Sequence, residues 1–291
     1  MLTLHHIGDL RSHLDAARRG GATVGLVPTM GYLHTGHQSL VRAAAADCDE
    51  VVTTIFVNPL QFAMGEDLDS YPRDIDGDSA KAAEAGATVL FVPDESEMYP
   101  AGRNGVATSV SVAALAGAME GASRPTHFAG VCTVVAKLFN IVGPCRSYFG
   151  EKDFQQLAIV STMARELSFP VEVVGCPTAR AADGLALSSR NAYLDDDERR
   201  VAPVLNRALR AGAELIAGGQ TDADAVREAM ASQIRSAPLG ELDYVEVADP
   251  ATLERQQRCR PGSRLFGAIR FGRARLIDNI DSADPPQVAD G

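Results

Sequence analysis

The stretch V-P-T-M-G-Y-L-H-T-G-H, residues 27–37, directly follows the apolar run 23–27 and decides the expected fold. An apolar run that is stopped by a proline predicts a strand, and residues 37–46 predict a helix. His34 and His37 are three residues apart, so they share one face at the start of this helix. A helix that begins after a strand presents backbone N–H groups and the positive end of its dipole. We therefore expect a nucleotide triphosphate site in which histidine replaces the lysine of a P-loop.

The histidine pair also fits two other interpretations, a plain polar helix face and a weak zinc site. Zinc is disfavoured because neither the other histidines nor the scattered cysteines complete a tetrahedral set nearby: His5, His6, His13, His127, Cys48, Cys132, Cys145, Cys176 and Cys259. No residue is therefore predicted to be a metal ligand.

Short β-rich runs alternate with alanine-rich helical runs through the first two-thirds of the chain. Strands are expected at residues 50–57, 88–92, 146–149 and 171–174, and helices at 75–85, 131–142 and 154–167. This alternation predicts right-handed βαβ units and an α/β fold with a Rossmann-like doubly wound parallel sheet. Such sheets bind ligands beyond the carboxyl ends of their strands, where polar segments of this chain lie.

The pattern changes after about residue 183. Amphipathic helices are predicted at residues 195–217 and 221–235, and strands of a small sheet at 243–247, 264–269 and 274–277. We therefore expect a Rossmann-like domain over residues 1–182 and a smaller α+β C-terminal domain over 183–280. The polar, proline-interrupted segment 281–291 is expected to be a disordered tail.

Composition and charge restrict the class of partner. The 291 residues are 46% hydrophobic and 22% charged, as in ordinary globular proteins, and the net charge of −11 argues against a nucleic-acid surface. Five cysteines without C-x-x-C spacing indicate a reducing compartment. The chain shows no secretory signal and no apolar run long enough to span a bilayer. A soluble, cytoplasmic protein with small-molecule partners is expected, without a nucleic-acid or membrane partner.

Four further segments contain candidate site residues. G-E-K-D, residues 150–153, enters a helix and offers a cation for phosphate, and L-S-S-R-N, residues 187–191, offers hydroxyls and an arginine that can wrap a triphosphate. F-V-N-P-L-Q-F, residues 56–62, places neutral amides among apolar residues, which suits a small polar substrate. R-P-T-H-F-A-G, residues 124–130, is a substrate clamp or simply a loop. Each segment alone also fits an ordinary cap or turn.

Six motifs together resemble the pantothenate synthetase (pantoate–β-alanine ligase) family over about residues 23–194. They are P-T-M-G-Y-L-H-T-G-H, F-V-N-P-L-Q-F, Y-P-R-D, R-P-T-H-F-A-G-V, F-G-E-K-D-F-Q-Q-L and D-G-L-A-L-S-S-R-N-A-Y-L. The histidine pair is similar to the H-x-G-H signature of the class I synthetase and nucleotidylyltransferase superfamily. The resemblance implies ATP-dependent condensation of (R)-pantoate with β-alanine through pantoyl adenylate, with AMP and pyrophosphate released. It also implies a homodimer, and Mg²⁺ bound mainly through the ATP phosphates.

The resemblance implies a role for individual residues as well. The expected catalytic residues are His37, His34 and Lys152, with His37 at the position usually assigned to proton transfer. The expected ATP-binding residues are Met30, Gly31, His34, His37, Gly150, Glu151, Lys152, Asp153, Ala179, Leu187, Ser188, Ser189 and Arg190. Those expected to bind pantoate or β-alanine are Gln61, Gln156, Asn58, Tyr71 and Arg124.

The chain departs from the family pattern at four places, one of which is Asp74, where Y-P-R-D replaces the usual Y-P-R-T. Ala179 replaces a valine that contacts ATP through its backbone, and Ala181 replaces a glutamate. Gly77 interrupts an acidic pair, so that only Asp76 and Asp78 remain there for Mg²⁺. The C-terminal domain is expected to act as a lid over the acyl adenylate. The alternatives are another H-x-G-H adenylyltransferase, a fragment of an aminoacyl-tRNA synthetase and a non-catalytic nucleotide-binding protein.

Overall fold

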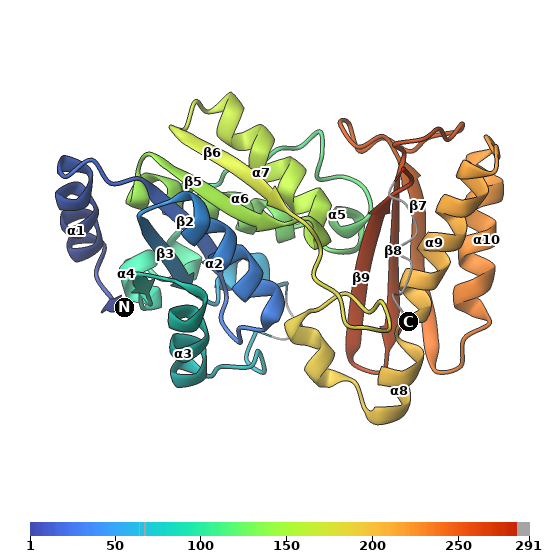
Figure 1. Ribbon diagram of the computed structural model, residues 1–291, viewed down its shortest axis with the longest axis horizontal. Coiled ribbons are helices and arrows are strands. Elements are labelled where there is room, and N and C mark those ends of the chain that lie inside the picture. The colour runs from blue at the N-terminus through green and yellow to red at the C-terminus, as the bar shows by residue number, and fades with distance from the viewer. Residues whose placement is uncertain (64, 67, 284–291) are drawn as a thin grey trace. The chain divides into compact units, whose positions relative to one another are not determined.

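The stretch at residues 27–37 begins at the end of a central strand of a six-stranded parallel sheet and continues beyond it (Figure 1). The computed structural model describes residues 1–63, 65–66 and 68–283, and the chain forms two units, Met1–Pro177 and Thr178–Gly291. The junction between the units follows Pro177, whereas the sequence pattern puts the domain boundary after residue 182. From residue 284 onward the predicted tail lies outside the described residues.

The first unit confirms the predicted doubly wound parallel sheet. Its strands lie in the order β1 (Leu2–Leu4), β4 (Val89–Phe91), β3 (Glu50–Ile55), β2 (Val24–Thr29), β5 (Cys145–Gly150) and β6 (Val171–Cys176). From β2 the chain moves outward to β3 and β4, and it then returns to the other side of β2 to form β5 and β6. The strand order therefore reverses between β2 and β5, which are paired neighbours.

Right-handed crossovers in opposite directions place the helices on both faces of this sheet. One face is covered by α2 (Thr35–Asp47) and α3 (Ile75–Ala85), which contribute Leu40, Val41 and Ala82 to an apolar core with Val27 and Val51. The crossovers through α1 (Ile7–Arg19), α6 (His127–Val142) and α7 (Phe154–Glu166) run in the opposite direction along the sheet, so these helices cover its other face. The short elements are α4 (Glu95–Met98), α5 (Glu120–Ser123), η1 (Pro59–Gln61), η2 (Arg103–Gly105) and η3 (Glu151–Asp153).

Two features of this unit differ from the expected elements. The strand β1 and the helix α1 precede the first expected strand and were not predicted. The helix α6 begins at His127 rather than at residue 131, so the predicted loop 124–130 is partly helical. A histidine side chain is thereby fixed on the first turn of a helix.

The second unit has the predicted α+β character. Its antiparallel sheet consists of β7 (Gly240–Ala248), β8 (Arg264–Phe271) and β9 (Ala274–Asp281), and its helices are α8 (Asp196–Val201), α9 (Val204–Ala217) and α10 (Ala223–Arg235), with η4 (Ser189–Tyr193) before them. The helix expected over residues 195–217 is divided, because Pro203 precedes the first turn of α9. No helix among the described residues is both long and apolar enough to cross a membrane.

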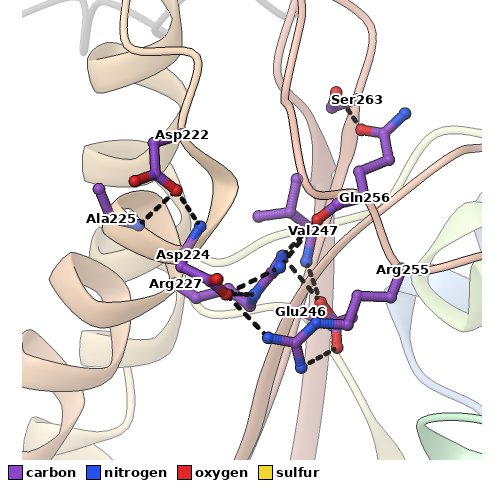
Figure 2. A network of polar contacts seen from close by, with 9 residues as sticks. All are labelled: Asp222, Asp224, Ala225, Arg227, Glu246, Val247, Arg255, Gln256 and Ser263. Atoms are coloured by element: carbon purple, nitrogen blue, oxygen red, sulfur yellow. Dashed lines mark hydrogen bonds and ion pairs between the residues drawn. The ribbon is translucent and has the colours of Figure 1, made fainter.

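A buried arginine ties α10 to the sheet of the second unit (Figure 2). The Arg227 guanidinium lies 3.2 Å from a Glu246 oxygen and 3.1 Å from an Asp224 oxygen, and it donates to the carbonyl of Gln256 at 2.8 Å. Arg255 pairs with the same two carboxylates, with Asp224 at 2.8 Å and with Glu246 at 3.5 Å. The charges are therefore balanced, and α10, β7 and the segment after β7 are held together.

Replacement of this buried arginine is expected to destabilise the second unit. Arg227→Ala should lower the free energy of unfolding by about 2–4 kcal/mol, because it removes a buried guanidinium and leaves the partly buried Glu246 with one partner fewer. Arg235→Ala on the same helix removes an exposed pair with Glu228 and should cost less than about 1 kcal/mol. Urea denaturation of both variants measures the difference, and equal losses would contradict the assigned role of Arg227.

Candidate functional site

Two of the predicted phosphate segments lie side by side where the strand order reverses. Residues 30–37 follow β2 and residues 150–153 follow β5, and these two strands pair in parallel. Their carboxyl ends therefore meet at one edge, which is where doubly wound sheets bind ligands. The charge of Lys152 acts on both His34 and His37, so the structure brings the three expected catalytic residues together.

A buried carboxylate fixes the shape of the first segment. Gly31 and Tyr32 have φ angles of 89° and 52°, a left-handed conformation that is unusual for tyrosine. Asp78 of α3 accepts hydrogen bonds from the backbone N–H groups of Tyr32 at 2.7 Å and Leu33 at 2.5 Å. The Thr29 hydroxyl accepts from the N–H of Gly31 at 3.1 Å. Three consecutive amides are thus held before α2 begins.

The two histidines form the N-terminal cap of α2. The N–H of Gly36 donates to Nδ1 of His34 at 3.1 Å, and the N–H of His34 donates to Nδ1 of His37 at 3.4 Å. The ring centroids lie 4.1 Å apart, so the two rings are in contact. Because Nδ1 is an acceptor in each neutral ring, the ring proton lies on Nε2. Both rings therefore present an N–H donor from Nε2.

The electrostatic surroundings keep both rings neutral near pH 7. Burial and, secondarily, the Lys152 ammonium lower the pKa of His34 to about 4. Burial and the neighbouring His34 lower the pKa of His37 well below its usual value. The site thus combines two neutral donors with the Lys152 cation, a set that suits phosphate oxygens. In this hydrogen-bonding pattern Nε2 of His37 donates a hydrogen bond and does not accept a proton.

The second phosphate segment continues from β5 into η3 and α7. Gly150 ends the strand, and Glu151, Lys152 and Asp153 form η3. Asp153 is the N-cap residue of α7, but its side chain makes no capping hydrogen bond. The Asp153 carboxylate instead accepts from the Lys152 ammonium at 3.4 Å. Lys152 is therefore oriented by its own neighbour.

The amide segment lies directly against the histidine loop. Gln61 of η1 places its Nε2 3.1 Å from the sulfur of Met30, and its Oε1 accepts from Asn58 at 3.1 Å. Asn58 also donates to the carbonyl of Gly130 at 3.1 Å and accepts from the hydroxyl of Tyr99 at 2.8 Å. Asn58 therefore has protein partners at both polar atoms and orients Gln61, while Gln61 adjoins the nucleotide loop.

The remaining substrate candidates of the first unit differ in their surroundings. Arg124 makes a two-point contact with Glu66 at 2.7 Å and 2.6 Å, so its charge is already paired. Tyr71 is buried edge-on against Phe62. Gln156 on α7 is half-buried, and its neighbour Gln155 donates to two carbonyls of the segment before α5. Gln155 is therefore structural, and Gln156 is the amide of this pair that stays a substrate candidate.

The other ATP-binding candidates, Ala179 and residues 187–190, belong to the second unit. The N–H of Leu187 donates to the carbonyl of Ala179 at 2.9 Å, which closes a short hairpin around residues 179–187. The Ser188 hydroxyl accepts from the N–H of Arg190 at 3.3 Å and caps η4, which contains Ser189 and Arg190. Leu187 and Ser188 thus lie between this hairpin and η4.

The side chains of the described residues do not fit a resident Mg²⁺ ion. No three histidine, cysteine or acidic side chains converge within the described ranges in the way a metal ion requires. Asp78, one of the two carboxylates left for the metal, is buried and uses both oxygens on backbone amides. The other, Asp76, is exposed. The side chains of the described residues therefore provide no cage for this ion.

The sheet order and the loops at its point of reversal place the chain in the class of doubly wound α/β proteins that bind their ligand there. Residues 2–281 match the family described as pantoate–β-alanine ligase. The chain belongs to this family.

Individual relatives are similar over nearly the whole length. The chain is 49% identical to a pantothenate synthetase from Moorella thermoacetica over 280 residues, which cover 96% of this chain and 98% of the relative. It is similar to the crystal structure of pantothenate synthetase from Thermus thermophilus, with 48% identity, a TM-score of 0.91 and coverage of 98% and 100%. The ligase from Francisella tularensis, complexed with β-γ ATP and β-alanine, has 32% identity, a TM-score of 0.79 and coverage of 99% and 100%.

Asp78 is expected to act on ATP binding through the loop it holds. Asp78→Asn places an amide N–H₂ against a backbone N–H, so one of the two hydrogen bonds that hold the loop is lost. KM for ATP should therefore rise about 10-fold or more, while KM for β-alanine stays within about 2-fold. Asp76→Asn, on the exposed side of the same helix turn, should behave as the parent enzyme. Steady-state kinetics test this, and recovery of Asp78→Asn by excess Mg²⁺ would instead identify a metal ligand.

Proposed function

We propose that this chain catalyses the ATP-dependent condensation of pantoate with β-alanine in two steps. The carboxylate of pantoate attacks the α-phosphorus of ATP, and the bond to pyrophosphate breaks, which gives pantoyl adenylate. The amine of β-alanine then attacks the acyl carbon, and AMP leaves as pantothenate forms. Family membership supports the overall reaction.

One observation supports the first step in particular, the contact between Gln61 and Met30. A carboxylate that attacks ATP must lie beside the nucleotide, and Gln61 is an amide that adjoins the loop containing both histidines. An amide can bind hydroxyl and carboxylate groups without adding a charge to the site. Gln156, at the first turn of α7 after Lys152, is the second amide that we assign to pantoate.

Charge development at the α-phosphate explains why this site needs few reactive groups. We assign Lys152 to that growing negative charge and the Nε2–H groups of His34 and His37 to the phosphate oxygens. Such preorganised donors act where charge appears in the transition state, and each contributes about 10²–10³ in rate. The segments at residues 30–37 and 150–153 would form the nucleotide site of the first unit. Ala179 and residues 187–190 of the second unit stay candidates for ATP binding.

Several finer points extend this proposal. Mg²⁺ would enter with ATP and be bound by its phosphates, because the side chains of the described residues form no cage for it. The second unit would act as a lid that keeps water from the acyl adenylate. A homodimer, which the resemblance to the family implies, and a cytoplasmic location, which the cysteine usage indicates, stay predictions.

Exchange of labelled pyrophosphate into ATP tests the first step alone. Exchange should require pantoate but not β-alanine, and His37→Ala and Lys152→Ala should each lower it about 10²–10³-fold because a donor to the transition state is lost. His13→Ala serves as the control, since His13 pairs with Glu50 at the first residue of β3, the opposite end of the strands from the site. Near-normal exchange in His37→Ala or Lys152→Ala would refute the assigned roles, and exchange without pantoate would refute the function.

A further inference from the structure

His127 is a largely buried histidine that the proposed reaction does not use. It is the first residue of α6, and its Nδ1 lies 3.0 Å from the backbone carbonyl oxygen of Gln61. A carbonyl oxygen only accepts hydrogen bonds, so Nδ1 carries the proton in the neutral ring. Nε2 therefore has an unshared electron pair. This is the reverse of the arrangement in His34 and His37.

The ring is neutral and its second nitrogen is open to a ligand. Burial and, secondarily, the Arg124 guanidinium lower the pKa of His127 to about 4. Nε2 has no hydrogen-bond partner among the described residues. It is also absent from the buried side-chain atoms that lack a partner, so this nitrogen is not sealed from solvent. His127 thus offers a neutral hydrogen-bond acceptor beside Gln61.

Close packing holds this acceptor in place. A Cβ atom at Gly130, one turn along α6, would clash with the carbonyl group of Leu60, so the helix backbone touches η1 directly. Arg124 donates to the carbonyl of Gln61 at 3.2 Å, the same oxygen that His127 contacts. The first turn of α6 and the residue Gln61 are therefore one rigid group.

The charges around His127 select the kind of group that it can bind. Arg124 and Glu66 are already paired through two contacts. The guanidinium is therefore not left to bind a carboxylate, and the Glu66 carboxylate is not left to bind an ammonium group. The other side chains around Gln61, those of Asn58 and Met30, are neutral. Glu120 is a further charged group that acts on His127, and it also has a partner. A neutral acceptor among paired charges suits a neutral hydroxyl donor, because an additional buried ion there would lack a counter-ion.

We propose that His127 accepts, through Nε2, a hydrogen bond from a hydroxyl group of pantoate and so helps the enzyme to select a hydroxy acid. The inference rests on the proposed function, in which pantoate lies at Gln61. In the segment at residues 124–130, the sequence favoured Arg124 as the residue that binds the substrate. The inference assigns this role to His127, three positions along. A site built to bind a hydroxyl group rejects analogues that lack it, since its acceptor is then left unpaired.

Two substitutions separate the two nitrogens of the ring. His127→Asn keeps a donor near the position of Nδ1, and hence the bond to Gln61, but removes Nε2. His127→Gln can place an acceptor near the position of Nε2 but loses the bond to Gln61. We expect His127→Asn to raise KM for pantoate about 10–100-fold, with KM for ATP and the melting temperature little changed. His127→Gln should keep KM for pantoate within about 3-fold and melt lower.

Pantoate-dependent pyrophosphate exchange provides the KM values for pantoate and ATP, steady-state synthesis that for β-alanine, and thermal denaturation the melting temperatures, with His13→Asn as the control. Deoxy analogues of pantoate, each lacking one hydroxyl group, complete the test. The analogue without the bound hydroxyl should be a poor substrate for the parent enzyme, and His127→Asn should not discriminate against it further. An unchanged KM for pantoate in His127→Asn, equal losses with every analogue, or a rise confined to KM for β-alanine would overturn the inference. Absence of exchange in the parent enzyme would instead refute the proposed function.

Discussion

The two hydrogen bonds from the loop after β2 to the carboxylate of Asp78 determine most of the site. They hold Tyr32 and Leu33 in a loop that contains two consecutive left-handed residues, and α2 begins directly after it. The start of α2 sets where His34 and His37 lie, and the backbone N–H groups there use Nδ1 of each ring. A buried acidic group on α3 thereby decides which ring nitrogen faces outward.

Hydrogen-bond direction divides three histidines of the first unit, His34, His37 and His127, into two kinds. Where the backbone donates to the ring, as at His34 and His37, Nε2 is a donor, and where the ring donates to the backbone, as at His127, Nε2 is an acceptor. Donors suit phosphate oxygens, and an acceptor suits a hydroxyl group. Burial lowers the pKa values of all three rings, so the positive charge near the histidine pair comes from lysines, from Lys152 first and from Lys81 second. The same residue type thus serves two ligands through its tautomer.

The sequence predicted the sheet well because its signals are local. Apolar runs mark β2 and β3, and Gly86 ends α3 where the pattern placed its end. Side-chain partners were not predictable, because they come from distant parts of the chain. Arg124 resembled a substrate clamp until its pair with Glu66 was visible, and Asp78 resembled a metal ligand although it binds a loop 46 positions away. The tautomer of His127 depends on one carbonyl and leaves no trace in the sequence.

The nitrogen-15 chemical shifts of the histidine rings test the central claim most directly. Spectra of the enzyme at pH 7, assigned with single histidine variants, report which nitrogen of each ring carries the proton. The structure predicts neutral rings with the proton on Nε2 in His34 and His37 and on Nδ1 in His127. The same tautomer in all three rings, or a positively charged ring at His34 or His37, would contradict this account.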